Sequence, residues 1–429
     1  MSGTDERRAK LSPEKQALLA KRLSSLATAA AKHPAAPRQE SLPASEPDLA
    51  LDLAVAGEPV APVSREVWRA LVEAGDRAAR RLEVAPGLLA DAAREPRLDE
   101  QAAVFISTAF RNLGVFQEAG EAWTIDRLIS ERGVLPKHRK VLLRWMVALE
   151  EEGLLKRNGD SWVAVEPVPP PALEARIAEE QRRMFGKNLK AVLTGETHPL
   201  EFYLPGGSSS AVESSYRELP IFHYCNGISA AVLGTQVESL RGATRLRVLE
   251  IGAGTGGTTA DLLPQLPPER TVYCFTDVSK FFTDLGRKKF QEYPFLRYRE
   301  LDIEKDPVEQ GYPEAGFDWL VAAHVLHATR NIAETLAHVR RILAPGGVLL
   351  LLEETRFQRK FNFTMGFLPG FDHFEDYDRR PLHPLLSSAE WGEALLASGF
   401  DDFATFTEPG SAAHVLGVDV MIARNSGGG

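Results

Sequence analysis

Residues Leu246 to Gly257 read LRVLEIGAGTGG, and this stretch decides the fold. Its first half is a short apolar run, which predicts a buried parallel strand. The glycines that follow allow a tight turn and close approach of a ligand, and the residues after them predict a helix. A strand, a glycine turn and a helix in this order favour a nucleotide-type cofactor. The residues expected at its site in this stretch are Glu250, Gly252, Gly254 and Gly256.

The glycine pattern alone leaves two alternatives open. Gly252, Gly254 and Gly257 also fit the G-x-G-x-x-G fingerprint of dinucleotide-binding proteins. A purely structural turn between a strand and a helix needs glycine as well. The rest of the chain therefore has to decide between these interpretations.

The composition is that of an ordinary soluble globular protein, with 429 residues, 44% of them apolar and 25% charged. The net charge of −9 argues against nucleic-acid binding, which requires a cationic surface. Cys225 and Cys274 are too few for a disulfide framework or a cysteine-rich metal site, so we expect a reducing compartment and no metal. The apolar runs are shorter than the roughly 20 residues of a membrane span, and no secretory signal opens the chain, which predicts a cytoplasmic protein.

From Arg247 onward, predicted strands alternate with predicted helices, which indicates an α/β domain with a mostly parallel sheet covered on both faces. Two more strands near the C-terminus predict an antiparallel pair with a turn at Pro409-Gly410. Five parallel strands followed by such a pair form the Rossmann-like, seven-stranded order of class I methyltransferases, whereas a dehydrogenase more often continues with a sixth parallel strand. The expected strands are Val248–Ile251, Val272–Thr276, Tyr298–Leu301, Phe317–Ala322, Val348–Leu352, Phe403–Phe406 and Val415–Ile422.

The chain divides into four expected segments. Residues 1–62 predict a basic helix and a linker rich in proline and alanine, which is either a disordered tail or a docking segment for a partner. Residues 63–170 predict a mainly helical domain that ends like a winged helix, with two helices and a hairpin turning at Asn158-Gly159. Residues 171–245 predict a helical lid or connector, and residues 246–429 predict the cofactor-binding core.

Chemistry-bearing residues follow the predicted strands, at the edge where open α/β sheets bind ligands. Asp277 ends the second strand, where a carboxylate can accept hydrogen bonds from both ribose hydroxyls. Asp302 is expected near an adenine amino group with Ile303 against the ring, unless Asp302 only caps a turn. His327 and Glu353 follow two strands that should be neighbours, so a histidine held by a carboxylate is expected as a general base. Considered singly, His327 could be an ordinary helix histidine and Glu353 a surface acid.

Longer motifs add specificity: LEIGAGTGGTTADLLP, FTDVS, YPFLRYRELDIEKDP, AAHVLHATRNIAETLAHVRRILAPGGVLLLLEETR and RRPLHPLLSSAEW. Together they resemble the carbon-methyltransferase domains embedded in polyketide synthases and in hybrid polyketide and peptide synthetases. The resemblance extends from residue 65 to residue 425 and implies that the core binds S-adenosylmethionine, with His324 expected at the cofactor site. It also implies that His327 and Glu353 act as the base that deprotonates the carbon between the two carbonyls of a carrier-bound β-ketoacyl chain.

Two positions depart from that family where the acceptor is expected to bind. The family usually has asparagine at the position of His324 and a tryptophan pair at Phe371-Asp372. The substrate and the methylated atom therefore stay open. Tyr216, Tyr224 and Asn226 are expected to close over the cofactor or to hydrogen-bond the acceptor, with plain packing as the alternative.

The resemblance also implies a partner, which is an acyl carrier protein or a synthase module that presents the acyl chain on a phosphopantetheine arm. Because carrier proteins are acidic, we expect cations at the mouth of the site. Arg356 and Arg359 follow the fifth strand and are the leading candidates, and a solvated loop with scattered charge is the alternative. Further cations expected there are Lys360, Arg379 and Arg380.

Two other functions stay open at this point. O-methylation of a hydroxyl or enol on a similar intermediate would use the same base. A non-catalytic winged-helix binding protein is less favoured, because the chain is acidic. Winged-helix modules also serve dimerisation in small-molecule methyltransferases, which leaves a homodimer as an option, and no membrane partner is expected. A DNA-binding version would use the basic residues Lys137, His138, Arg139, Lys140 and Arg144.

Overall fold

The computed structural model describes residues 60–425, apart from most of 171–187 and residues 198–218, 242–243 and 369. The expected N-terminal helix, most of its linker and Tyr216 lie outside the described residues. Within the described part of the chain, no helix is both long enough and apolar enough to cross a membrane.

A seven-stranded, mostly parallel sheet forms the core and confirms the expected class I methyltransferase fold. Its strands are β4 (Leu246–Ile251), β5 (Thr271–Asp277), β6 (Leu296–Glu300), β7 (Phe317–Ala323), β8 (Leu343–Glu354), β9 (Asp402–Thr405) and β10 (Val418–Asn425). They lie in the order β6-β5-β4-β7-β8-β10-β9. Strands β4 to β8 pair in parallel, and β10 is antiparallel to both of its neighbours.

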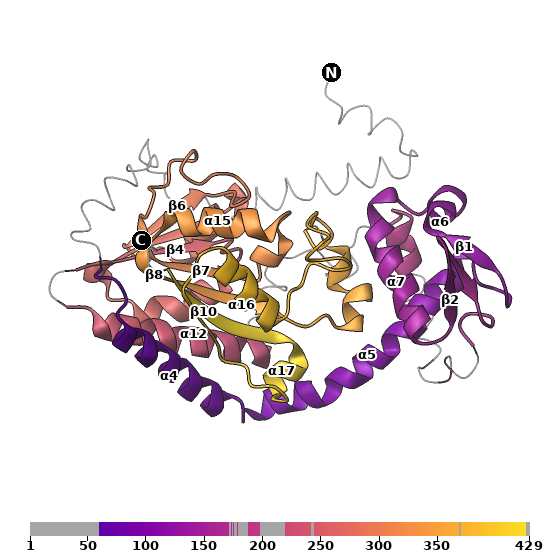
Figure 1. The fold of residues 1–429 in the computed structure, drawn as a ribbon, viewed down its shortest axis with the longest axis horizontal. Coiled ribbons are helices and arrows are strands. Elements are labelled where there is room, and N and C mark those ends of the chain that lie inside the picture. The colour runs from indigo at the N-terminus through magenta and orange to yellow at the C-terminus, as the bar shows by residue number, and fades with distance from the viewer. Residues whose placement is uncertain are drawn as a thin grey trace, which may run out of the picture. The chain divides into compact units, whose positions relative to one another are not determined.

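Helices cover both faces of this sheet, which is why its central strands are apolar on both sides. On one face, α4 (Arg65–Leu82) and α12 (Pro220–Ser239) lie side by side and pack on alternate side chains of the central strands (Figure 1). On the other face, α15 (Ile332–Ile342) and α16 (Ser388–Ala397) pack on the intervening side chains. Two further helices follow the first strands, α13 (Gly257–Leu262) and α14 (Lys280–Lys289).

The prediction that the last strand begins at Val415 is wrong. Residues Ala412–Leu416 form a short helix, α17, and β10 begins at Val418. The hydroxyl of Ser411 accepts a hydrogen bond from the His414 N–H at the start of α17, and Gly417 ends it with φ at +76°. A helix cap and a left-handed glycine therefore override the apolar pattern at this point.

A winged-helix unit precedes the sheet, and the long helix α5 (Pro86–Leu113) runs from α4 to it (Figure 1). The hairpin between its last two strands turns at Gly159, with φ at +61°, as the sequence predicts. Its apolar cluster also takes in Phe363 and Phe367, which belong to the loop after β8. The unit consists of α6 (Ile125–Arg132), α7 (Arg139–Glu151) and the antiparallel strands β1 (Ala122–Thr124), β2 (Leu155–Asn158) and β3 (Ser161–Ala164).

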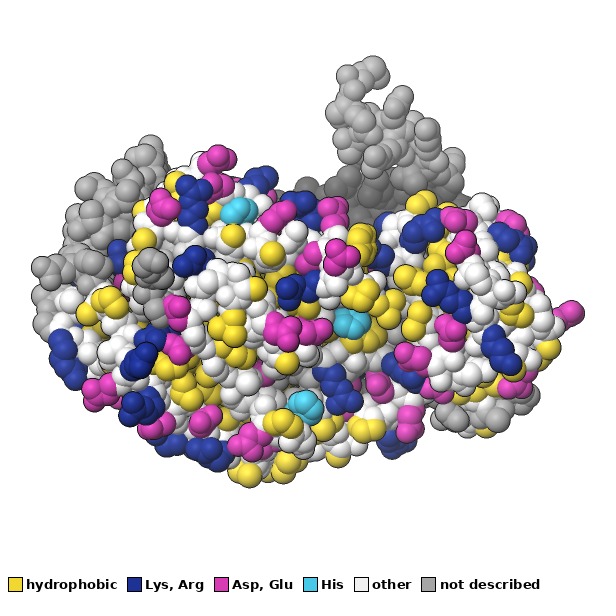
Figure 2. Space-filling model, viewed as in Figure 1, with side chains coloured by type: hydrophobic (Ala, Val, Ile, Leu, Met, Phe, Trp, Pro, Cys, Tyr) yellow, Lys and Arg dark blue, Asp and Glu magenta, His cyan; other side chains and the backbone are white. Residues whose placement is uncertain are grey.

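Basic residues of α7 contact the loop after β8. Arg144, whose side chain is 1% exposed, lies 2.5 Å from Asp372, and Lys140 donates to the carbonyls of Asp372 and Phe374 at 2.8 and 2.5 Å. The Trp145 indole donates to the Asn362 carbonyl at 2.8 Å. These contacts engage cations that a DNA-reading helix would expose. Figure 2 also shows acidic and basic side chains interspersed on the face in view, so the regulator alternative gains no support.

We predict that Asp372→Asn lowers the free energy of unfolding by about 2 to 4 kcal/mol, because it leaves the buried Arg144 guanidinium without its counter-charge. Urea unfolding followed by circular dichroism would measure the loss. Adding Arg144→Met to this variant should recover part of it, since the two side chains are coupled. Asp378→Asn, an exposed aspartate of the same loop, is the control. A loss for Asp372→Asn no larger than for the control would contradict the pairing.

Candidate active site

The ends of β7 and β8 bring together the histidine and the glutamate expected as a base. The two strands are parallel neighbours, with Ala323 paired to Leu352, so the loop after β7 lies beside the end of β8. His327 lies in the short 3₁₀ helix η4 (Leu326–Ala328) of that loop. The carboxylate Oε2 of Glu353 lies 2.5 Å from His327 Nδ1.

The carboxylate of Glu353 also holds the backbone of this loop. Its side chain is fully buried, and its Oε1 accepts N–H bonds from Val325, Leu326 and His327 at 3.2, 2.8 and 3.4 Å. A buried carboxylate needs such partners, because desolvation of an unpaired charge is costly. Glu353 therefore fixes both the backbone and the ring of His327.

The charges around His327 favour proton uptake. Burial by itself lowers the pKa of His327, but the charge of Glu353, its hydrogen bond and the charge of Glu354 outweigh burial and raise the pKa above the usual value. Because a carboxylate only accepts, Nδ1 donates to Glu353, which leaves Nε2 as the atom that can take a proton. The arrangement is that of a general base with an orienting carboxylate.

Arg380 holds the same loop from the opposite side. Its side chain is fully buried and pairs with Asp376 at 2.5 Å. It donates to the carbonyls of His327 and Thr329 at 2.8 Å and to that of Arg330 at 3.0 Å. The expectation that Arg380 lies at a cationic mouth is therefore wrong. Its guanidinium is buried, and it binds Asp376 and the carbonyls of the His327 loop.

The glycine turn after β4 forms a concave loop. Gly252, Gly254 and Gly256 have φ at +61°, +55° and +72°, a region that side chains strongly disfavour. A Cβ at Gly252 would lie 2.5 Å from the Val325 side chain, whereas one at Gly257 would meet nothing within 4 Å. The loop thus packs against the Val325 side chain at Gly252 and leaves space at Gly254 and at Gly257, the first residue of α13, which fits a ligand that approaches the backbone closely.

The acidic residues after β5 and β6 lie around this loop. Burial raises the pKa of Asp277, and its carboxylate accepts N–H bonds from Gly254 at 3.0 Å and from Ser279 at 2.8 Å. Asp302 is half-buried, and its Oδ2 lies 2.9 Å from Lys305 Nζ. Ile303 is buried and its carbonyl accepts a bond from His338 at 2.8 Å. The buried Asp277 and the half-buried Asp302 fit a ribose and an adenine amino group, respectively.

Glu250 lies beneath the loop instead of at its surface. It is 1% exposed, and its carboxylate accepts hydrogen bonds from the hydroxyls of Thr259 and Tyr273 at 2.5 and 2.7 Å. Burial raises its pKa to about 7, although both hydrogen bonds act to lower it. These bonds tie the start of α13 to β4 and β5, and a direct contact of Glu250 with the cofactor stays a prediction.

His324 forms a second histidine–carboxylate pair beside the first. Its Nδ1 lies 2.9 Å from Glu354 Oε2, which is also 4.0 Å from His327 Nδ1. The ligand atoms of His327, Glu353 and Glu354 all lie within 4.8 Å of one another. The two hydrogen-bonded pairs account for this proximity, so we assign no metal to them.

The expected substrate residues Tyr224 and Asn226 make their hydrogen bonds elsewhere than at the two histidine–carboxylate pairs. The hydroxyl of Tyr224 lies 3.5 Å from the Phe406 carbonyl inside the apolar core. Asn226 joins α12 to α13, since its amide donates to Asp261 at 2.7 Å and accepts from the Thr258 hydroxyl at 3.2 Å. Their contacts to cofactor or acceptor stay predictions.

An apolar cavity of about 560 Å³ lies against the second histidine–carboxylate pair. It is lined by Glu354, by Phe222 of α12 and by apolar side chains such as Phe361 and Met365, and five more charged residues border it: Asp91, Arg94, Glu95, Arg97 and Lys360. Sequence reasoning missed Glu354 and Phe222, and it also missed the positioning role of Arg380. The two adjacent glutamates at the end of β8 could have indicated a role for Glu354 in the sequence. The sequence around Phe222, in contrast, does not show that its ring contacts the ring of His324.

Comparisons with known proteins agree with this geometry. A methyltransferase domain family matches residues 249–349. Polyketide synthase ThaQ of Burkholderia thailandensis is 32% identical over 331 residues, which are 71% of this chain and 16% of ThaQ. The crystal structure of the CurJ carbon methyltransferase is 32% identical, with a TM-score of 0.74, and the match covers 86% of this chain and 100% of that one. The trans-methyltransferase CalH in complex with SAH is 25% identical, with a TM-score of 0.52 over 77% of this chain and 91% of CalH.

The fold, the glycine loop and these matches define a class I methyltransferase that uses S-adenosylmethionine. The sheet order and the identity to CurJ over its whole length narrow the class further. The chain belongs to the carbon-methyltransferase domains of polyketide synthases. It spans 6% to 16% of the length of the eight curated synthases compared with it.

We predict that Arg380→Lys lowers turnover by about 10²-fold. Lysine keeps the charge, but its three donors lack the planar fork that bonds Asp376 and three carbonyls together, and small displacements of a reacting group cost about that much. Methyl transfer and thermal unfolding, measured on the same preparation, would test this. Arg330→Lys is the matched control, since its side chain is 42% exposed and pairs with Glu334 on the surface. Equal turnover in both variants would refute the positioning role of Arg380.

Proposed function

We propose that this domain methylates the α-carbon of a carrier-bound β-ketoacyl chain, with His327 as the base. The observation that carries the proposal is the buried His327–Glu353 pair at the carboxyl ends of two adjacent strands. A methyl group on a sulfonium is electrophilic enough to need only an in-line nucleophile, so catalysis reduces to positioning and proton removal. The similarity to a carbon methyltransferase and to a polyketide synthase supports the substrate class.

Each part of the site has one task in this proposal. His327 Nε2 takes the proton from the α-carbon, Glu353 stabilises the imidazolium that results, and Arg380 keeps the loop in place. Gly252, Gly254 and Gly256 would hold the cofactor, together with the carboxylates of Asp277 and Asp302 and the side chain of Ile303. The apolar cavity beside Glu354 would take the acyl chain and exclude water.

We expect His327→Ala to lower turnover by about 10² to 10⁴-fold while cofactor binding persists, because general-base contributions have that size and the cofactor residues lie elsewhere. Glu353→Gln should lose less, and its pH profile is diagnostic. The raised pKa of His327 places the acid limb of kcat/KM above the usual histidine value, and loss of the Glu353 charge should move that limb to lower pH.

Methyl transfer to a β-ketoacyl thioester from a deuterated methyl donor would measure both effects, and fragmentation of the product would locate the label on carbon or oxygen. A label on oxygen would favour O-methylation. His414→Ala, at an exposed position on α17, is the control. Near-normal turnover of His327→Ala would remove it as the base.

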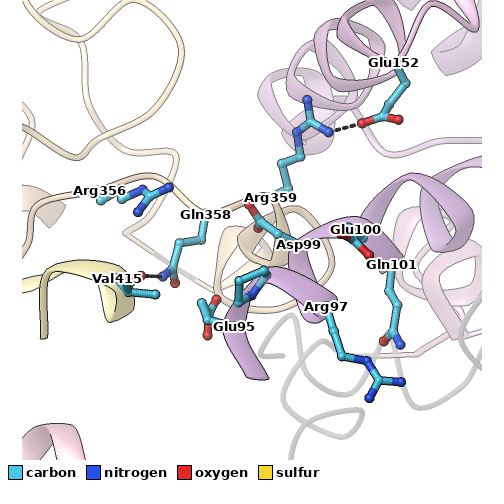
Figure 3. Close-up of a pocket in the computed structure, with 11 residues that line it drawn as sticks. Glu95, Arg97, Asp99, Glu100, Gln101, Glu152, Arg356, Gln358, Arg359 and Val415 are labelled. Carbon is cyan, nitrogen blue, oxygen red and sulfur yellow. Dashed lines mark hydrogen bonds and ion pairs between the residues drawn. The ribbon is translucent and has the colours of Figure 1, made fainter. Parts of the chain in front are cut away.

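A second hollow adjoins the acyl cavity and is the proposed route of the carrier arm (Figure 3). It has a volume of about 820 Å³ and shares Glu95, Arg97 and Gln358 with the first cavity. The mouth is not uniformly cationic as expected, because four acidic residues lie among its three arginines. Arg359 is neutralised by Glu151 and Glu152, and Lys360 by Glu95. In contrast, Arg97 and Arg356 have no ion-pair partner among the described residues.

We therefore expect Arg356→Glu to raise KM for a carrier-bound substrate by about tenfold, and more at low salt, because the side chain is exposed and its charge would attract an acidic carrier or a phosphate. A small thioester mimic without phosphate should keep its KM. Steady-state kinetics at two salt concentrations would separate the two substrates. Lys156→Glu, an exposed charge reversal on β2, is the control, and equal effects on both substrates would place Arg356 in the active-site architecture instead.

A further inference from the structure

The pair formed by His324 and Glu354 has no task in the proposed mechanism. Its two polar atoms lie 2.9 Å apart, and the side chains of His324 and Glu354 are 20% and 13% exposed. Two histidine–carboxylate pairs side by side are more than proton removal at one carbon requires.

His324 adopts an unusual backbone conformation. Its φ is +56°, in the left-handed region that non-glycine residues rarely occupy, and its N–H donates to the Leu352 carbonyl at 2.8 Å. Such conformations persist where the surrounding structure enforces them, often at functional sites. Here the residue leaves the end of β7 with its ring against Phe222 of α12, at 5.3 Å between ring centroids.

One nitrogen of His324 is left without a partner. Nδ1 is engaged by Glu354, whereas Nε2 is buried and has no hydrogen-bond partner in the described part of the chain. A buried polar atom without a partner costs free energy, so it indicates a ligand that completes it. Two side chains that contact the ring, those of Glu354 and Phe222, line the apolar cavity of about 560 Å³.

The charges around the ring make Nε2 a donor. Burial lowers the pKa of His324, but the charge and hydrogen bond of Glu354 and the charge of Glu353 outweigh burial and His327, so the pKa is raised. Burial likewise raises the pKa of Glu354, yet the two histidines bring it down to about 2. A carboxylate that stays ionised favours the imidazolium form of His324, in which both nitrogens donate.

We propose that His324, held by Glu354, donates its Nε2–H to the acceptor's carbonyl oxygen and stabilises the enolate that forms when His327 removes the α-proton. The α-carbon–hydrogen bond breaks, its electron pair moves into the carbonyl to leave a negative oxygen, and the proton ends on His327 Nε2. This inference rests on the proposed function, since it needs an enolisable acyl chain in the cavity. It assigns the two pairs complementary roles, a base and an oxyanion donor.

The step can be followed without methyl transfer. Solvent deuterium exchange at the α-carbon of a β-ketoacyl N-acetylcysteamine thioester reports enolisation alone, and calorimetry reports cofactor affinity. His324→Gly suits the left-handed backbone and removes the donor, so exchange should slow by about 10²-fold with cofactor affinity unchanged. His324→Asn also tolerates this backbone and restores a neutral donor, so it should recover part of the rate. His414→Asn is the control.

The outcomes separate this inference from the proposed function. No enzyme-catalysed exchange by the unaltered protein would count against the proposed function itself. Normal exchange in His324→Gly with weakened cofactor binding would overturn the inference and restore the cofactor contact that the sequence predicts. If His324→Gly fails to fold, Glu354→Gln decides, because it keeps the shape of the pair but not its charge: slower exchange supports the inference, and exchange at the normal rate overturns it.

Discussion

The site depends on the burial of one carboxylate, that of Glu353. Placing a charge at the covered end of β8 costs several kcal/mol unless it is compensated, and the compensation comes from the loop after β7. Three consecutive N–H groups and the ring of His327 converge on it. Burial of the Glu353 carboxylate thereby fixes the position of His327, the base in our proposal, before any substrate arrives. Such preorganisation is what a deprotonation catalyst requires.

Arg380 extends this constraint to a distant part of the chain. It ends the loop whose middle is held by Arg144 and Trp145 of α7, and its guanidinium bonds the carbonyls of the histidine loop. Helix α7 and the His327 loop are thus linked through the segment from Asn362 to Arg380, which contacts both of them. The basic helix α7 contributes here to holding the loop after β8 in place.

The acidic doublet at the end of β8 gives the site its asymmetry. Glu353 is enclosed and pairs with His327, whereas Glu354 borders the cavity of about 560 Å³ and pairs with His324. Adjacent residues of a strand point to opposite faces, so one doublet can supply both pairs. The pKa of each histidine is raised by the same two carboxylates, which couples their protonation.

The sequence by itself determined the parallel core and the edge at which the site lies. Strand periodicity, the glycine turn and polar residues just after the strands depend on local geometry, so His327 and Glu353 could be paired from the strand order alone. The apolar pattern did not determine that α17 replaces the start of the predicted last strand, because the Ser411 cap and Gly417 outweigh an apolar run. Only the tertiary structure decided that Arg380 is buried, that Arg359 is neutralised and that Phe222 meets His324. These facts depend on contacts between segments more than 50 residues apart, which no local pattern encodes.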